Sequence, residues 1–93
     1  MKELIVRVCN DRGLHARPSA QFSSVAKKFD CRVTVTASDR SADGKSIMGL
    51  LTLAATQNSR LVICLVGPQA AEAAEALLEQ CSDTICLDAK SDS

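Results

Sequence analysis

The segment GLHARPSA, residues 13–20, contains the side chains of this chain that are best suited to chemistry. His15 is the only histidine of the sequence, and Arg17 follows it by two positions. An imidazole changes its charge near neutral pH and can bond a transferred group through a ring nitrogen. A guanidinium carries donors that match a planar oxyanion or a phosphate. The pair therefore indicates transfer of an anionic group, and a phosphoryl group fits it best.

The predicted surroundings of His15 favour this chemistry. A helix is predicted to begin near Ala16, which places His15 at a position resembling its N-cap, and Pro18 is tolerated in a first turn. The amides of Ala16 and Arg17 have no partner within such a helix and can face an anion. The positive end of the helix dipole favours a neutral, nucleophilic imidazole. We therefore assign His15 and Arg17 as catalytic residues, and the backbone of Ala16 and Arg17 as phosphoryl-binding.

A simpler interpretation of His15 stays open on spacing alone. A histidine near the start of a helix commonly caps the helix or faces solvent. No general-base partner lies nearby in the sequence, and no Ser-His-Asp or Cys-His arrangement can be argued. The single histidine has no ligand-spaced partner, so neither a metal site nor a cofactor is expected.

The spacing of apolar residues predicts the elements that must position this segment. Strands are predicted over residues 3–9, 31–38 and 60–67, with the last at the centre of the sheet because it is apolar on both sides. Residues 39–45 form a turn with at most a weak short strand. Helices are predicted over residues 16–29, from Ser46 as N-cap to about Ala55, and over 70–81. The apolar stripe of the second helix comprises Ile47, Leu50, Leu51 and Ala54.

These elements predict one α+β domain with the order β-α-β-β-α-β-α. A four-stranded, mostly antiparallel sheet with three helices on one face is the economical architecture, an open-faced sandwich. The domain is expected to span residues 1–88, and residues 89–93 are expected to form a disordered tail because the end of the chain lacks a sustained period.

Composition excludes several classes of function. The 93 residues include eleven basic and eleven acidic side chains and only two aromatic ones, so a nucleic-acid partner is not expected. No apolar run approaches the ~18 residues of a membrane span and no signal peptide is recognised, so we expect a soluble, cytoplasmic protein without membrane insertion. The five cysteines are odd in number and include no C-x-x-C pair, which predicts reduced thiols that act mostly as small core residues.

Two motifs identify a family resemblance. NDRGLHARPSA and GKSIMGLLTLAA, with their order, the element pattern and the length, resemble the HPr family of histidine-containing phosphocarriers of the bacterial phosphoenolpyruvate-dependent sugar phosphotransferase system. The resemblance implies a relay rather than a turnover enzyme. His15 would accept a phosphoryl group on Nδ1 from the first enzyme of the system and pass it to sugar-specific second-component enzymes, while Arg17 neutralises the phosphoryl charge.

The resemblance also implies regulation and a docking face. Ser46 matches the residue that a serine kinase/phosphorylase modifies in many family members. The partner-binding patch would combine Ala20, Ser24 and Lys27 of the first helix with Ile47, Met48 and Leu51 of the second. The small residues at positions 20 and 24 depart from the pattern expected of the family, which leaves partner preference open. A monomer is expected because a carrier must expose His15 to successive partners.

Three other functions stay open on the sequence. The first is a paralogous carrier of a nitrogen-related regulatory phosphorelay, against which the KSIMG motif argues. The second is a non-catalytic module that senses an anion through Arg17 and the helix amides. The third is a purely structural or interaction domain, which only the family motifs disfavour.

Overall fold

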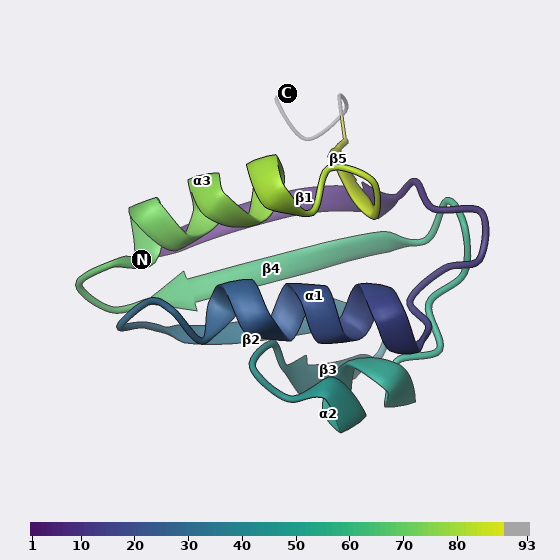
Figure 1. Ribbon diagram of the computed structural model, residues 1–93, viewed down its shortest axis with the longest axis horizontal. Coiled ribbons are helices and arrows are strands. Elements are labelled where there is room, and N and C mark those ends of the chain that lie inside the picture. The colour runs from purple at the N-terminus through teal and green to yellow at the C-terminus, as the bar shows by residue number, and fades with distance from the viewer. Residues whose placement is uncertain (89–93) are drawn as a thin grey trace.

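The computed structural model describes residues 1–88 (Figure 1). Its elements are β1 (Lys2–Val8), α1 (Ala16–Ala26), β2 (Arg32–Ala37), β3 (Arg40–Asp43), α2 (Ile47–Thr52), β4 (Arg60–Val66), α3 (Ala70–Gln80) and β5 (Ile85–Leu87). No helix within residues 1–88 is long and apolar enough to cross a membrane. The disordered tail predicted for residues 89–93 falls outside the described residues.

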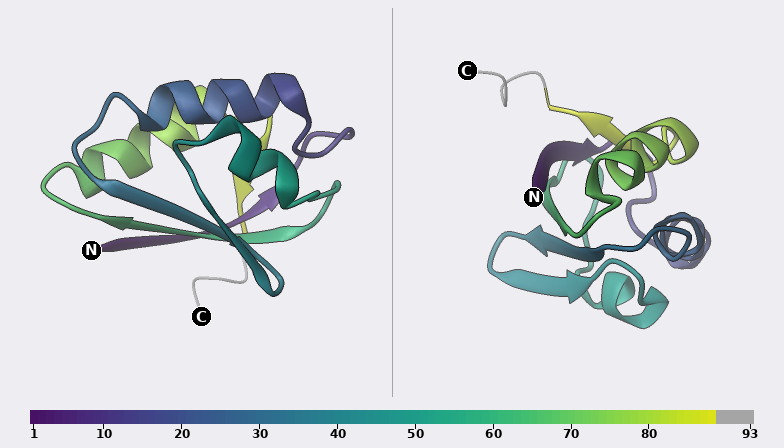
Figure 2. Two further views of the ribbon diagram at one scale, coloured as in Figure 1. Left: turned by 90° about the horizontal axis from the view of Figure 1, so that it is seen from below. Right: turned by 90° about the vertical axis from the view of Figure 1, so that its left-hand side faces the viewer.

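The strands form one antiparallel sheet in the order β3-β2-β4-β1-β5, with the three helices on one face (Figure 2, left). The predicted open-faced sandwich is thus confirmed, and β4 lies at the centre of the sheet as expected. The expected strand number was wrong, because β5 adds a fifth strand beside β1. This strand has only three residues, too few to show an alternation of apolar and polar side chains. Its pairing with β1, in which Val8 lies opposite Ile85, makes it a strand.

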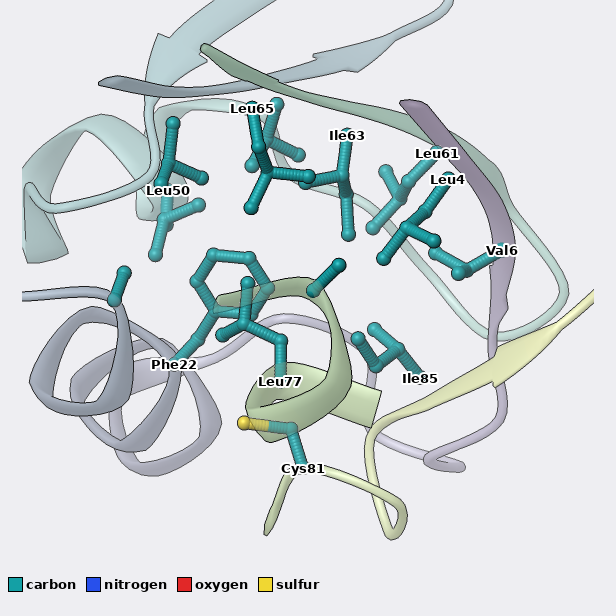
Figure 3. Packing of buried hydrophobic residues seen from close by; sticks show 14 of the residues in the cluster. Leu4, Val6, Phe22, Leu50, Leu61, Ile63, Leu65, Leu77, Cys81 and Ile85 are labelled. Carbon is teal, nitrogen blue, oxygen red and sulfur yellow. The ribbon is translucent and has the colours of Figure 1, made fainter. Parts of the chain in front are cut away.

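The core lies between the sheet and the helices. Alternate residues of β4, namely Leu61, Ile63 and Leu65, are fully buried on the helix side. Phe22 of α1 and Leu77 of α3 point toward them from the helix layer (Figure 3). Each such side chain contributes roughly 1.5–3 kcal/mol by its removal from water. This shared core holds α1 against the sheet and so fixes the direction of its N-terminus.

Two helices end earlier than their patterns predict. The first ends at Ala26 rather than near residue 29. The second ends at Thr52, and Ala54 adopts a left-handed conformation with φ of 51° and is exposed, so the prediction that Ala54 belongs to the apolar stripe was wrong. Leu50, Leu53 and Ala55 are the residues of this segment that enter the core. A chain that turns out of the helix at Ala54 cannot continue the helical spacing.

The cysteines correct a second prediction. Cys9 and Cys86 form a disulfide with their Cα atoms 6.0 Å apart, so these two are not the reduced thiols expected. The pairing was missed because it depends on β5, which brings Cys86 opposite Arg7 at the end of β1. Cys31 and Cys81 are buried thiols and Cys64 is a half-buried one. Burial raises the pKa of Cys81 from 9.0 to about 11, so it stays protonated and serves as a core residue, as predicted.

An ion-pair cluster secures the residue that follows β5. Asp88 is buried, and its Oδ2 accepts from Arg60 Nε at 3.1 Å and lies 3.5 Å from Arg7 Nε. The Asp88 amide also donates to the Ile5 carbonyl. A buried carboxylate needs such partners, because desolvation without them is costly. The end of the described chain is therefore fixed to β1 and β4.

Reduction of the Cys9–Cys86 disulfide should lower stability without unfolding the chain. The cross-link closes a loop over 77 positions, so its removal restores entropy to the unfolded chain and should lower the free energy of unfolding by about 2–4 kcal/mol. The thermal midpoint should fall by about 10–20 °C. Calorimetry with and without a reductant measures this.

The double variant Cys9→Ser/Cys86→Ser separates the cross-link from its side chains. It should match the reduced protein, whereas Cys64→Ser should still respond to the reductant like the unaltered chain. Equal midpoints for oxidised and reduced protein would contradict the contribution assigned to the disulfide.

Candidate active site

The segment between β1 and α1 is a compact turn organised by Asn10. Its side-chain Oδ1 accepts a hydrogen bond from the Arg12 amide at 2.8 Å, and its carbonyl accepts one from the Gly13 amide at 3.1 Å. Gly13 has φ of +73°, a conformation that L side chains rarely adopt. The turn therefore redirects the chain within a few residues and delivers it to the start of α1.

The turn is attached to a second connection, which leads from α2 into β4. Figure 1 shows the two connections at the same end of the molecule. The Leu14 amide donates to the Ala55 carbonyl at 2.9 Å, and the Leu14 side chain is buried. A Cβ at Gly13 would collide with the same Ala55 carbonyl. Close backbone contact therefore fixes the position of the residue before His15.

His15 is the N-cap residue of α1, as predicted. Its backbone is extended, with φ of −97° and ψ of −168°, and its carbonyl accepts the first helical hydrogen bond, from the Ser19 amide at 3.0 Å. The imidazole makes no capping hydrogen bond and is half-buried, so its ring nitrogens are not committed to closing the helix. The alternative in which the His15 side chain caps α1 is therefore not observed.

The charges around His15 favour an incoming anion. The amides of Ala16 and Arg17 precede the first helical hydrogen bond, and Pro18 has no N–H. No acidic residue lies in the first turn of α1. Arg17 is exposed, and no carboxylate among residues 1–88 forms a salt bridge with it, since the ion pairs there join Arg7 and Arg60 to Asp88. Two backbone donors at the start of α1 and the exposed guanidinium of Arg17, two residues after His15, are thus available to an anion.

Ser46 lies apart from this cluster. It is the N-cap of α2, and its Oγ accepts a hydrogen bond from the Gly49 amide at 3.0 Å, as the sequence predicts. The Ser23 hydroxyl donates to the Lys45 carbonyl at 2.7 Å, which joins the start of α2 to the middle of α1. Ser23 is eight residues along the chain from His15, roughly 12 Å at the helical rise. The start of α2 therefore lies beside the second half of α1 rather than beside His15.

The residues predicted to form a docking face lie on two packed helices. α1 and α2 are in contact. Among the apolar candidates, Met48 is 71% exposed and Ile47 is 39% exposed, whereas Leu51 and Ala20 are half-buried. The polar candidate Ser24 is exposed on α1, and Lys27 is exposed at the C-cap position directly after it.

Asn10, Gly13 and Ala55 are site-supporting residues that the sequence analysis did not assign. The NDRG segment does signal a turn, and a glycine directly before an apolar anchor indicates a left-handed position. The contact with Ala55 has no such signal, because it joins positions more than forty residues apart. No group of three His, Cys, Asp or Glu side chains within residues 1–88 is placed to hold a metal ion.

Gly13→Ala should destabilise the protein and displace the segment before His15. The left-handed backbone disfavours a Cβ by about 1–2 kcal/mol, and the collision with Ala55 adds to this, so the free energy of unfolding should fall by about 1–3 kcal/mol. Chemical denaturation measures the loss, and amide chemical shifts of Leu14 and His15 report the displacement.

The control is Gly49→Ala, because Gly49 lies within α2 and has no left-handed backbone. Its free energy of unfolding should change by less than about 1 kcal/mol. A Gly13→Ala variant as stable as the unaltered chain, with unchanged shifts, would show that the contact with Ala55 does not hold the turn.

Comparison with known proteins relates this geometry to a family. The profile described as "PTS HPr component phosphorylation site" matches residues 2–83. The phosphocarrier protein HPr of Vibrio cholerae serotype O1 is 44% identical over 78 residues, which cover 84% of this chain and 92% of that protein. The crystal structure of HPr-C-His from Thermoanaerobacter tengcongensis has a TM-score of 0.83 at 34% identity and covers 88% of this chain and 92% of its own.

A second structure, the phosphocarrier protein HPr from Bacillus anthracis, has a TM-score of 0.79 at 34% identity and covers 85% of this chain and 94% of its own. The family profile and the curated relatives span most of the chain, including the turn and the start of α1. The chain therefore belongs to the HPr family, the phosphocarrier proteins of the phosphotransferase system.

Proposed function

We propose that His15 is the residue of this phosphocarrier that bears the phosphoryl group, and that Arg17 with the amides of Ala16 and Arg17 holds it. One observation carries this proposal: the imidazole of the N-cap residue of α1 makes no capping hydrogen bond, and the first turn of the helix contains no acidic residue. Residues 1–88 constitute the carrier domain in this proposal.

The transfer step follows from the groups present. A ring nitrogen of neutral His15 attacks the phosphorus in line, a P–N bond forms, and the bond from phosphorus to the donor breaks with its electron pair leaving on the donor. The phosphoryl oxygens gain charge-assisted hydrogen bonds from the guanidinium of Arg17 and the two amides. Because the same contacts are present in either direction, the group can be passed on to an acceptor.

We propose the first enzyme of the phosphotransferase system as the donor and sugar-specific second-component enzymes as acceptors. Each would dock on the patch formed by Ala20, Ser24, Lys27, Ile47, Met48 and Leu51. Flexible Met48, which is largely exposed, suits a surface that must fit several partners in turn. The carrier acts in the cytoplasm as a monomer in this scheme, since each partner must reach His15.

Phosphorylation of Ser46 by a serine kinase/phosphorylase would regulate this docking. A phosphate on the N-cap of α2 would accept hydrogen bonds from the free amides at the start of the helix. It would also add about −1.5 to −2 charges to the docking patch. The fold would tolerate the group, while an acidic partner surface would be repelled.

Intact mass after incubation with phosphoenolpyruvate and a first enzyme tests the proposal. We expect one acid-labile phosphoryl group on the unaltered chain and none on His15→Ala. Arg17→Ala should accept the group about 10²–10³ times more slowly, because it removes a donor that acts on developing charge. An unmodified mass with a demonstrably active donor would contradict the carrier function. Equal rates for Arg17→Ala and the unaltered chain would contradict the role of the guanidinium alone.

Ser46→Asp should slow phosphorylation of His15 by about tenfold, because the new charge faces the partner and like charges in an interface disfavour association. The effect should shrink with added salt. The thermal midpoint should stay close to that of the unaltered chain, since aspartate also caps helices. Initial rates at two ionic strengths and a thermal melt measure both outcomes.

The matched control is Ser46→Ala, which removes the hydrogen bond to Gly49 without adding charge. It should lose about 1 kcal/mol of stability and keep the normal rate. Slowing of Ser46→Ala to the same extent as Ser46→Asp would show that the cap, rather than the charge, governs transfer.

A further inference from the structure

We propose that Cys9 and Cys86 form a reversible thiol–disulfide switch that sets how firmly the turn before His15 is held. Its regulatory consequence rests on the proposed function of His15. Cys9 is the first residue after β1 and begins the segment that leads to His15. Cys86 is the middle residue of β5, an edge strand of three residues. The disulfide thus joins the sheet edge to the active-site turn.

The disulfide is accessible to thiols in solution. Cys86 is exposed and Cys9 is half-buried. Exchange needs direct attack on a sulfur atom, so exposed disulfides are the labile ones, whereas buried ones resist reduction. Cys31 and Cys81 are buried in the core and so cannot readily replace either partner.

The surroundings also accommodate the reduced state. Cys9 Sγ lies 3.5 Å and Cys86 Sγ 3.8 Å from the same acceptor, the Ser82 carbonyl oxygen. Two thiols would therefore have an acceptor for a weak S–H hydrogen bond at their present positions. The Cys9 amide donates to the Thr84 carbonyl at 2.8 Å independently of the sulfur chemistry. Breaking the cross-link thus leaves the strands paired and the fold intact.

The chemistry is exchange with a low-molecular-weight thiol, R–SH. Its thiolate attacks the sulfur of Cys86, which is an exposed residue, the S–S bond breaks, and Cys9 leaves as a thiolate that takes up a proton. A second R–S⁻ attacks the mixed disulfide, which releases Cys86 as a thiol after protonation and forms R–S–S–R. Two electrons pass from two R–SH to the protein, and the reverse reaction uses R–S–S–R as the oxidant.

The disulfide affects His15 because it helps to anchor the turn between Cys9 and Leu14. At its far end the turn is held by Leu14 on Ala55, and at its near end by the Cys9 amide and the disulfide. Reduction leaves the near end with backbone hydrogen bonds alone. Fluctuation of the turn should then increase, which reduces the fraction of time that His15 spends in the geometry for transfer.

The full chain should be equilibrated over a range of reduced and oxidised glutathione, alkylated with N-ethylmaleimide and analysed by intact mass. Two additional alkylation sites should appear reversibly as the ratio becomes reducing. Cys64→Ser should preserve this gain of two, whereas Cys86→Ser should lose the paired gain and show at most one glutathione adduct, on Cys9, which the intact mass identifies. A count of alkylated cysteines that does not vary across the range would overturn the switch.

Hydrogen exchange over seconds to minutes should show faster exchange in residues 9–13 and 84–88 of the reduced form, with β4 protected in both forms. The reduced form and Cys86→Ser should accept a phosphoryl group about three- to tenfold more slowly than the oxidised form. Equal exchange, or equal nonzero transfer rates, would overturn the coupling. Absence of transfer in both forms would instead contradict the proposed function, since the mass and exchange measurements do not depend on it.

Discussion

The hydrogen bond from the Leu14 amide to the Ala55 carbonyl determines where α1 begins, the helix that carries the proposed site. It holds two distant connections together at one end of the sheet, and it is possible only because Gly13 has no Cβ and a left-handed backbone. His15 follows directly and becomes the N-cap of α1. The imidazole and the first free amides of the helix therefore share one small region, which is what a transferred phosphoryl group requires.

The rest of the fold keeps this arrangement in place while leaving it open to solvent. The sheet and the core around Phe22, Leu65 and Leu77 fix the axis of α1 (Figure 3). Arg7 and Arg60 are engaged by Asp88, whereas no ion pair within the described chain occupies Arg17. The core holds α1 rigidly, and the Arg17 guanidinium has no ion-pair partner within the described chain. Both properties suit a carrier that must bind the same anion before and after each transfer.

Local signals in the sequence predicted the helices, two of their N-caps and most of the strands. The features that the sequence did not predict depend on contacts between distant parts of the chain. His15 and Ser46 were placed correctly as N-caps because capping is a local property. The strand β5 was missed because three residues carry no period, and the Cys9–Cys86 pairing was missed with it. Ala54 was misassigned because helical spacing continues in the sequence beyond the point where the backbone turns. The support from Ala55 is visible only once the chain has folded.

The most direct measurement is a proton–nitrogen NMR spectrum of the chain before and after phosphorylation of His15. If the helix N-terminus holds the phosphoryl oxygens, the amide protons of Ala16 and Arg17 should shift strongly downfield, while those of β4 stay in place. Phosphorylated protein in which these two amides do not move would contradict the account. The phosphoryl group would then be held by side chains alone, and the geometry of the turn would not be its cause.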